Sequence, residues 1–446
     1  MRARMLIARA AGRLSRRLGR GGTSLPGKVL LRLAPEAIAR LAGRLPHGSA
    51  VISATNGKTT TAAMVAAILE RGGARLVSNR QGANMAGGVA TALLDGRGDT
   101  GLFEVDEFWL DQVERQLQPR AILLANLFRD QLDRYGELET IADRWAAVAG
   151  RTPARLVLNA DDPLIADLDR RGDARFFGVE DPSLAMAEMQ HAADAKHCRT
   201  CGAPYRYDAI FLGHLGHFHC DACGATRPRP HVAAHDVVLE GVRGARFTLR
   251  TPEGDAQVAL PLPGLYNVYN ALGAAALALE LGAPLADVAA GLQAVSPAFG
   301  RAETVRIAAH EVLLLLVKNP AGANEVLRTL VLEDGDHDVL AILNDRIADG
   351  RDVSWVWDAD FEVLAPRVRR VTCAGTRAPE LALRLKYAGV PEDRIVVEPT
   401  LDRALDAAVR ALPAPDAPLV AVPTYTAMLE LRDLLADRGV VRGQFT

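Results

Sequence analysis

One segment combines residue types and spacing suited to holding phosphate groups: Ser53-Ala54-Thr55-Asn56-Gly57-Lys58-Thr59-Thr60. It follows the apolar run 50–52, which predicts a buried strand, and precedes a helical pattern over 61–71 that a Gly-Gly pair ends. At such a turn, backbone N–H groups face the phosphates, the lysine neutralises their charge, and the next hydroxyl reaches Mg²⁺. Only five of the 52 basic residues are lysines, so a lysine at position 58 indicates a need for a compact ammonium group. We therefore expect a phosphate-binding loop rather than a chance Gly-Lys-Thr at the start of an ordinary helix.

A second group of residues has the spacing of a metal site: Cys198-x2-Cys201 and Cys220-x2-Cys223 are separated by eighteen residues. Two such pairs can place four thiolates tetrahedrally around Zn²⁺. Four cysteines fill that site and leave no open position, so we expect a structural zinc within an inserted ribbon, at about residues 192–230. A nucleic-acid-binding ribbon is the alternative, because Arg227 and Arg229 follow. The nearby histidines are expected to face solvent or to pack, not to bind metal: His197, His214, His217 and His219.

Carboxylates gather at the end of a third pattern, the apparent strand 101–107, which carries Glu104, Asp106 and Glu107. Further strands are predicted at 121–126 and 155–162. Polar groups at the carboxyl ends of parallel strands are placed to bind ligands, and a carboxylate there could hold Mg²⁺. Chemistry alone does not rank the three acids, and a solvated acidic turn is the alternative.

The whole chain is long enough to position these groups in about three domains. Of its 446 residues, 49% are hydrophobic and 24% charged, which is typical of a globular protein. The net charge of −2 offers no general attraction for nucleic acid. No apolar run approaches the roughly 18 residues that span a bilayer. Paired cysteines beside one lone Cys373 favour a reducing compartment, so we expect a cytoplasmic protein.

The first 35 residues carry only positive charges, since the first acidic residue of the chain is Glu36. Apolar residues recur near helical spacing and predict an amphipathic basic helix: Leu6, Ile7, Ala10, Leu14 and Leu18. The segment lacks the continuous apolar core of a secretory signal. Two interpretations remain open, a solvated helix packed on its own domain and a peripheral contact with an anionic membrane face.

The last third of the chain again alternates strands and helices, which predicts a second doubly wound domain. Its expected strands are 312–317, 339–343, 369–374, 394–397 and 419–422. Between them lies the segment 343–358, which is rich in acids and holds Trp355 and Trp357. Such a segment suggests a site or a docking surface, or else an acidic loop over a partly buried tryptophan pair.

The motif Thr-Asn-Gly-Lys-Thr-Thr resembles the loop of the Mur ligases and folylpolyglutamate synthases, which use ATP to activate a carboxylate and form an amide; Ala54 replaces a glycine common in them. The resemblance implies ATP and Mg²⁺ as cofactors, with Thr59 and Glu104 on the magnesium. The segment 126–134 resembles a second family motif, although Gln131 replaces a histidine that helps to hold a second magnesium. The implied nucleotide contacts extend to Asn267, in Gly-x-x-Asn-x-x-Asn at 264–270, and to Arg301, in Gly-Arg-x-Glu at 300–303. Without the family, these would be a helix cap and a surface arginine.

The combination of that central domain, the four-cysteine ribbon and three later motifs resembles the MurT family over essentially the whole chain. The motifs are Asp-Val-Ser-Trp-Val-Trp-Asp at 352–358, Arg-Leu-Lys-Tyr-Ala-Gly at 384–389 and Pro-Thr-Tyr-Thr-Ala-Met-Leu at 423–429. The implied fold is α/β: a basic segment (1–45) packing on or near a Mur-ligase-like central domain with the zinc ribbon inserted (46–304), then a Rossmann-like C-terminal domain (305–446).

The MurT resemblance also implies an activity and a partner. MurT is the ligase-like subunit of the lipid II isoglutaminyl synthase, whose other subunit, GatD, is a class I glutamine amidotransferase. The implied reaction is ATP-dependent amidation of the D-glutamate α-carboxylate in the peptidoglycan precursor. Lys58 and Glu104 would act on the phosphoryl group. An aspartate of the last domain would complete the partner's Cys–His pair; Asp352 is our choice, with Asp349 behind it.

Two other functions compete with this interpretation. A stand-alone Mur-type ligase would add an amino acid instead of ammonia. The segment 316–322 replaces the Asp-Tyr-Ala-His-x-Pro found in many such ligases, which argues against that function. An ATP-binding scaffold that recruits partners through its ribbon and tryptophans would show no ATP turnover dependent on a carboxylate.

Overall fold

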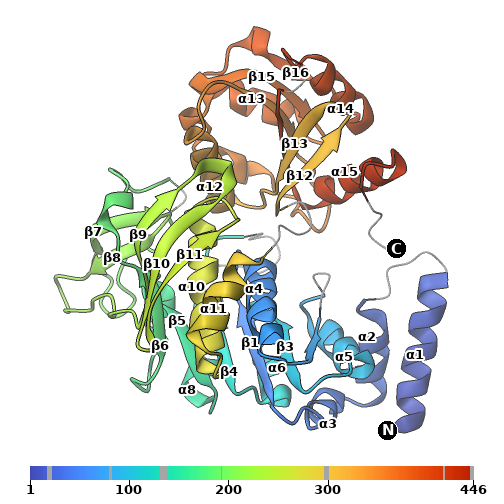
Figure 1. Cartoon of the computed structure of the whole chain (residues 1–446), viewed down its shortest axis with the longest axis vertical. Helices are drawn as coiled ribbons and strands as arrows, with labels where there is room; N and C mark the ends of the chain where they lie inside the picture. The colour runs from blue at the N-terminus through green and yellow to red at the C-terminus, as the bar shows by residue number, and fades with distance from the viewer. Residues whose placement is uncertain are drawn as a thin grey trace.

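The computed structural model describes residues 1–17, 23–79, 83–130, 138–191, 193–295, 301–414 and 417–441. Two α/β domains lie one above the other, with the N-terminal helices at the side of the lower, central domain (Figure 1). Gly300 and the residues from Gln131 to Arg134, which the family motifs include, fall outside the described residues.

The central domain is built on a sheet that has nine strands within the described ranges. Neighbouring strands run parallel from β2 to β9, and β10 and β11 extend the sheet antiparallel. Their spatial order is β11 (Gly254–Leu260), β10 (Ala245–Thr251), β9 (Val232–Leu239), β6 (Arg175–Val179), β5 (Arg155–Asn159), β4 (Ala121–Leu124), β1 (Ser49–Ser53), β3 (Thr100–Glu104) and β2 (Leu76–Ser78).

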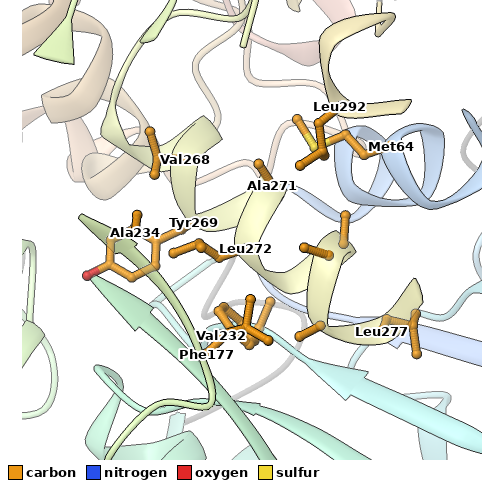
Figure 2. Close-up of a cluster of buried hydrophobic side chains, with 14 of the residues drawn as sticks. Met64, Phe177, Val232, Ala234, Val268, Tyr269, Ala271, Leu272, Leu277 and Leu292 are labelled. Atoms are coloured by element: carbon orange, nitrogen blue, oxygen red, sulfur yellow. The ribbon is translucent and has the colours of Figure 1, made fainter. Parts of the chain in front are cut away.

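Both faces of this sheet are covered, which explains why β1 is buried along its whole length. Side chains alternate between faces along a strand, so Ala50 and Ile52 join one core and Val51 the other. The first core packs under α4 (Lys58–Arg71), α10 (Leu265–Glu280) and α11 (Leu285–Gln293). Figure 2 shows α10 crossing this face, with Leu272 above Phe177 and Val232 of the sheet and Met64 of α4 beside Leu292. Each such side chain contributes roughly 1.5–3 kcal/mol on burial.

The opposite face carries the remaining helices of the lower domain: α2 (Leu25–Leu33), α3 (Ala37–Ala42), α5 (Ala86–Asp95), α6 (Leu110–Leu117), α8 (Leu138–Arg151) and α9 (Pro163–Ala166). The N-terminal helix α1 (Arg2–Arg17) packs on α2, and α2 packs on α5. A two-stranded ribbon, β7 (Arg206–Leu212) and β8 (Leu215–His219), is inserted between β6 and β9.

The C-terminal domain has six sheet strands within the described residues, in the order β12 (Arg301–Ile307), β13 (His310–Leu315), β17 (Leu419–Pro423), β14 (His337–Ile342), β15 (Val368–Ala374) and β16 (Ile395–Val397). All pairs are parallel except β12 with β13. Helices cover both faces: α12 (Pro320–Val331) and α13 (Ala378–Tyr387) on one, α14 (Leu401–Arg410) and α15 (Tyr425–Asp437) on the other. Five of these strands were predicted from the sequence, but β12 was not; the C-terminal sheet therefore begins at Arg301, inside the range 46–304.

Candidate active site

The predicted phosphate loop lies between β1 and α4, at the carboxyl edge of the parallel strands. Gly57 has φ +84°, and a Cβ atom there would stand 2.0 Å from Asn270 Oδ1, so only glycine fits. The φ of Ala54 lies outside the left-handed region, so the backbone there does not require the glycine that Ala54 replaces. Helix α4 begins at Lys58, so the backbone N–H groups of its first turn have no partner within the helix and point into the site. These N–H groups can stabilise a bound anion.

The end of β4 holds the loop in shape. The Asn126 side chain accepts a hydrogen bond from Asn56 N (2.9 Å) and donates one to Asn56 O (3.1 Å). The Thr55 hydroxyl accepts from Phe128 N (3.1 Å) and donates to Phe128 O. These paired contacts hold the loop backbone in shape, and the Thr55 side chain takes part in them.

The two predicted magnesium ligands lie side by side. Thr59 Oγ1 donates to Glu104 Oε2 at 2.9 Å, at the end of β3. The Asn79 side chain positions Glu104 by donating a hydrogen bond to its backbone O (2.7 Å) and accepting one from its backbone N–H (3.0 Å). A hydroxyl beside a carboxylate is a hard-oxygen donor set of the kind that Mg²⁺ prefers.

Two lysines face acids deep in the site. Lys58 Nζ lies 2.9 Å from Glu107 Oε2, and Lys318, from the loop after β13, pairs with Asp130. Burial opposes the ionisation of Glu107, but the charges of Lys58 and Lys318 outweigh it and lower its pKa. Burial raises the pKa of Asp130, although the charge of Lys318 acts in the opposite direction. Burial alone would lower the pKa of Lys318, but the carboxylates of Asp130 and Glu107 outweigh it and raise that pKa. Lys318 is therefore held charged.

The N-terminus of α10 forms the next wall. Asn270 donates to Asn267 Oδ1 at 3.0 Å and accepts from the Thr61 hydroxyl of α4, while Asn267 donates to Pro263 O at 2.8 Å. Asn270 thus joins α10 to α4 beside the phosphate loop, and both asparagines line the cleft. Arg301 opens β12, and its side chain is outside the described part of the structure.

A cavity of about 350 Å³ lies between the two domains and brings these groups together. The central domain lines it with residues 55–60, Glu104 and Asp106, and the C-terminal domain with Lys318 and Glu325, among others. Asn319, which also caps α12, exchanges side-chain hydrogen bonds of 3.0 and 3.3 Å with Asn56. The C-terminal domain therefore touches the phosphate loop directly.

The four cysteines form one cluster, with their sulfurs within 4.8 Å of one another. Cys198 and Cys223 are 3.6 Å apart and Cys201 and Cys220 are 3.5 Å apart, close to the ~3.8 Å that tetrahedral Zn–S bonds of about 2.3 Å require. Each pair sits in the same turn, Cys-x2-Cys-Gly, whose glycine has φ +76°. Burial opposes ionisation of Cys198, but N–H groups of Cys201 and Thr200 lower the pKa of its thiol to about 6. Hydrogen bonds among the clustered thiols raise the pKa of Cys201 and Cys223 against their backbone N–H contacts.

The ribbon is tied to both domains rather than free. After the second turn, Arg227 pairs with Asp161 (2.6 Å) and Glu180 (2.7 Å) of the central domain. From α12, Arg328 donates to Phe211 O at 2.6 Å. Arg227 is thus an anchor within the protein, which disfavours the nucleic-acid alternative for that residue.

The segment 344–358, called the Trp loop below, brings the three later motifs together. Asp349 is buried and accepts hydrogen bonds from the backbone N–H (2.7 Å) and hydroxyl of Thr426; burial raises its pKa despite them. Arg384 donates to Val356 O and Ala359 O, beneath the Trp357 ring. Asp352 is exposed and accepts from Ser354 N at 2.8 Å, which lowers its pKa.

Residue Cys373 does not contribute to any of these groups. It is fully buried in β15, where burial raises the pKa of its thiol to about 12. A nucleophilic cysteine needs an accessible thiolate, so Cys373 is unsuited to that role.

Several residues of the site were missed or left unranked by sequence reasoning. Glu107 was weighed only together with Glu104 and Asp106, and Lys318 and Asn319 were assigned no role. One signal could have found Lys318: the scarcity of lysine that singled out Lys58 applies equally to it. Asp130 and Asn126 lay within the matched family segment but had no role assigned.

The fold and the phosphate loop define a Mur-type ATP-dependent ligase. A model of the Mur ligase middle domain matches residues 52–221, and a model of the MurT ligase C-terminal domain matches residues 316–428. A pseudomurein peptide ligase type C from Methanothermus fervidus has the same fold, with a TM-score of 0.69 and 22% identity, over 90% of this chain and 80% of that one.

The chain belongs to the MurT family. The MurT subunit of lipid II isoglutaminyl synthase (glutamine-hydrolyzing) from Streptococcus pneumoniae R6 is 34% identical, over 98% of this chain and 97% of its own. The subunit of the same name from Staphylococcus aureus N315 is 31% identical, over 98% of both chains.

Proposed function

We propose that this chain is the synthase subunit of a lipid II isoglutaminyl synthase. It amidates the D-glutamate α-carboxylate of the stem peptide to D-isoglutamine, with ATP and with ammonia from a glutaminase partner of the GatD type. The observation that carries the proposal is the phosphate loop with its Thr59–Glu104 pair, set in a cleft that both domains line. The near-complete match to relatives named for this activity supports the substrate.

The charge balance of the cleft supports the use of a divalent cation. Carboxylates outnumber the lysines here: Glu104 and Asp106 line the cleft with Lys58 and Lys318, while Glu107 and Asp130 pair with the two lysines. A polyphosphate would add more negative charge to this excess. Mg²⁺ on Thr59 and Glu104 would offset it and stabilise the transferring phosphoryl group.

The reaction then needs two steps. A carboxylate oxygen attacks the γ-phosphorus of ATP, ADP leaves, and an acyl phosphate forms. Ammonia attacks the acyl carbon, inorganic phosphate leaves, and the nitrogen loses a proton. Lys58 and the N–H groups at the start of α4 hold the phosphoryl oxygens, and Lys318 approaches from the other domain. Asn267, Thr60 and Arg301 complete the proposed nucleotide contacts.

A separate glutaminase subunit is supported by the Trp loop. Cys373 is buried, whereas Asp352 is exposed and free to orient a histidine of a docked partner. The Asp349 carboxylate already accepts hydrogen bonds from Thr426, which favours Asp352 for this role. Near Asp352 the protein exposes apolar side chains suited to docking. The exposed fraction is 71% for Ile347, 51% for Trp357 and 69% for Tyr387, whose ring packs against Trp357. Ala348, in the same loop, lines the ATP cleft.

The proposed zinc has a structural role. Cys198, Cys201, Cys220 and Cys223 would hold Zn²⁺ and stabilise a ribbon that packs against both domains.

The test is ADP release by the purified chain with Mg²⁺, ammonium and a stem-peptide precursor. We expect release to depend on both the precursor carboxylate and ammonium, and to fall at least ~100-fold in Lys58→Ala. Lys28→Ala, at an exposed lysine of α2, is the matched control and should stay active. Release that needs an added amino acid instead of ammonium would make the chain a stand-alone ligase. No release with any carboxylate would favour the scaffold.

A further inference from the structure

Helix α1 has two apolar faces, and the described part of the structure covers one of them. Met5, Ala8, Gly12 and Ser15 follow helical spacing and are buried toward α2. The approach is close, since a Cβ atom on Gly12 would stand 2.6 Å from Pro26. On the opposite side, Leu6, Ile7 and Leu14 are 60%, 54% and 60% exposed. We call these three residues the α1 stripe.

Basic residues flank the stripe. Within the described part of the chain, no carboxylate pairs with Arg2, Arg4 or Arg13, and all three are exposed. Residues 1–35 contain nine basic groups and no acid. The rest of the chain has the remaining 43 basic residues against 54 acids, a formal charge of −11. The molecule is therefore strongly polarised, with α1 at its positive end.

The charges also decide what can cover the stripe. A second copy of the chain would bring two sets of unpaired arginines together, which like-charge repulsion disfavours. The surface proposed for the glutaminase belongs to the C-terminal domain, whereas α1 lies at the side of the central domain (Figure 1). An anionic lipid surface satisfies both features, because acyl chains accept leucine and isoleucine while headgroup phosphates pair with arginine.

We propose that α1 lies flat on an anionic membrane, with the α1 stripe among the acyl chains and the arginines at the headgroups. No described helix is long and apolar enough to cross a membrane, so the contact is peripheral. Through α2 and α5 the helix is joined to Asn84 and Met85, which precede α5 and line the ATP cleft. The inference does not depend on the proposed reaction, but it would hold the cleft close to a lipid-linked substrate.

The test is flotation of the full chain with vesicles of phosphatidylcholine alone or with about one-third phosphatidylglycerol. We expect binding to the anionic vesicles only, weakening as salt rises. We expect the triple variant Leu6→Gln/Ile7→Gln/Leu14→Gln to lower the bound fraction at least ~10-fold. The triple variant Arg2→Gln/Arg4→Gln/Arg13→Gln should weaken the salt dependence, since six of the nine basic groups remain. The matched control replaces exposed apolar residues elsewhere with glutamine, namely Val238, Leu332 and Val397. Circular dichroism and ammonium-dependent ADP release should be unchanged in all variants.

Several results would overturn the proposal. Equal binding to both vesicles, or no binding to either, would exclude an anionic membrane. An equal loss in the control would show a general surface effect. If the stripe variant instead abolished self-association or capture of the glutaminase, the stripe would be a protein contact. Because vesicle binding needs no catalysis, a failure of this proposal is distinguishable from a failure of the proposed reaction.

Discussion

Asp352→Asn should separate the two nitrogen sources of the proposed reaction. In the described structure, the Asp352 carboxylate accepts hydrogen bonds from the Ser354 backbone N–H, at 2.8 Å, and from the Ser354 side chain. An asparagine Oδ1 can accept the same hydrogen bonds. The residue is exposed and is not among the residues that line the ATP cleft, so folding and ATP use should be preserved. The variant loses only the negative charge that would orient and stabilise a histidine of the partner.

The expected magnitude follows from the role of that charge. In serine proteases, removing the aspartate charge from the catalytic triad lowers turnover by up to ~10⁴. We therefore expect glutamine-driven amidation to fall by about 10²–10⁴, and ammonia-driven amidation to change by less than about twofold. The free energy of unfolding should change by less than about 0.5 kcal/mol, since the site is exposed.

The assay measures amidated precursor with glutamine or with ammonium, using the complex of both subunits. Asp349→Asn is the matched control: it disturbs the buried pair with Thr426 and should cost about 1–3 kcal/mol of stability. It should affect both nitrogen sources equally. If Asp352→Asn lowered both activities to the same extent, or Asp349→Asn alone separated them, the assignment would be wrong.

Three further outcomes are expected. Lys58→Ala should abolish ATP-dependent product while the zinc content, measured by atomic absorption, stays at that of the unmodified chain. Cys198→Ser should remove the zinc and lower the melting temperature, because the ribbon contacts both domains; an unchanged melting temperature would make the metal dispensable for folding. Glu107→Gln should destabilise the protein at neutral pH, since the lowered pKa of Glu107 means that its stabilisation is present above the unfolded value of 4.5. The difference in the free energy of unfolding between the variant and the parent protein should shrink as the pH falls through and below 4.5. A difference that does not depend on pH would contradict the ion-pair account.

Strand patterns and local motifs were enough to predict the two doubly wound domains, the phosphate loop and the four-cysteine cluster. These features depend on residues close together in the sequence, such as Gly57 beside Lys58 and Cys198 beside Cys201. Their local geometry follows from residue type, since a positive φ needs glycine and a metal turn needs paired thiols.

Contacts between the domains were not predictable in this way. Asn319 and Asn56 are 263 residues apart in sequence, and Lys318 and Asp130 are 188 apart. Only the packing of the C-terminal domain over the loop brings them together. The same limit applied to Asp349 and Asp352, which the sequence did not separate and which differ in burial because Thr426 packs against only one of them.

The most direct test of the central claim is mass spectrometry of lipid II after incubation with this chain, ATP, Mg²⁺ and glutamine labelled with ¹⁵N in its amide. With the glutaminase subunit present, the account predicts labelled, amidated lipid II and stoichiometric ADP and phosphate. With this chain alone, it predicts product from ammonium but none from glutamine. Product carrying an added amino acid, or labelled product made from glutamine by this chain alone, would contradict the account.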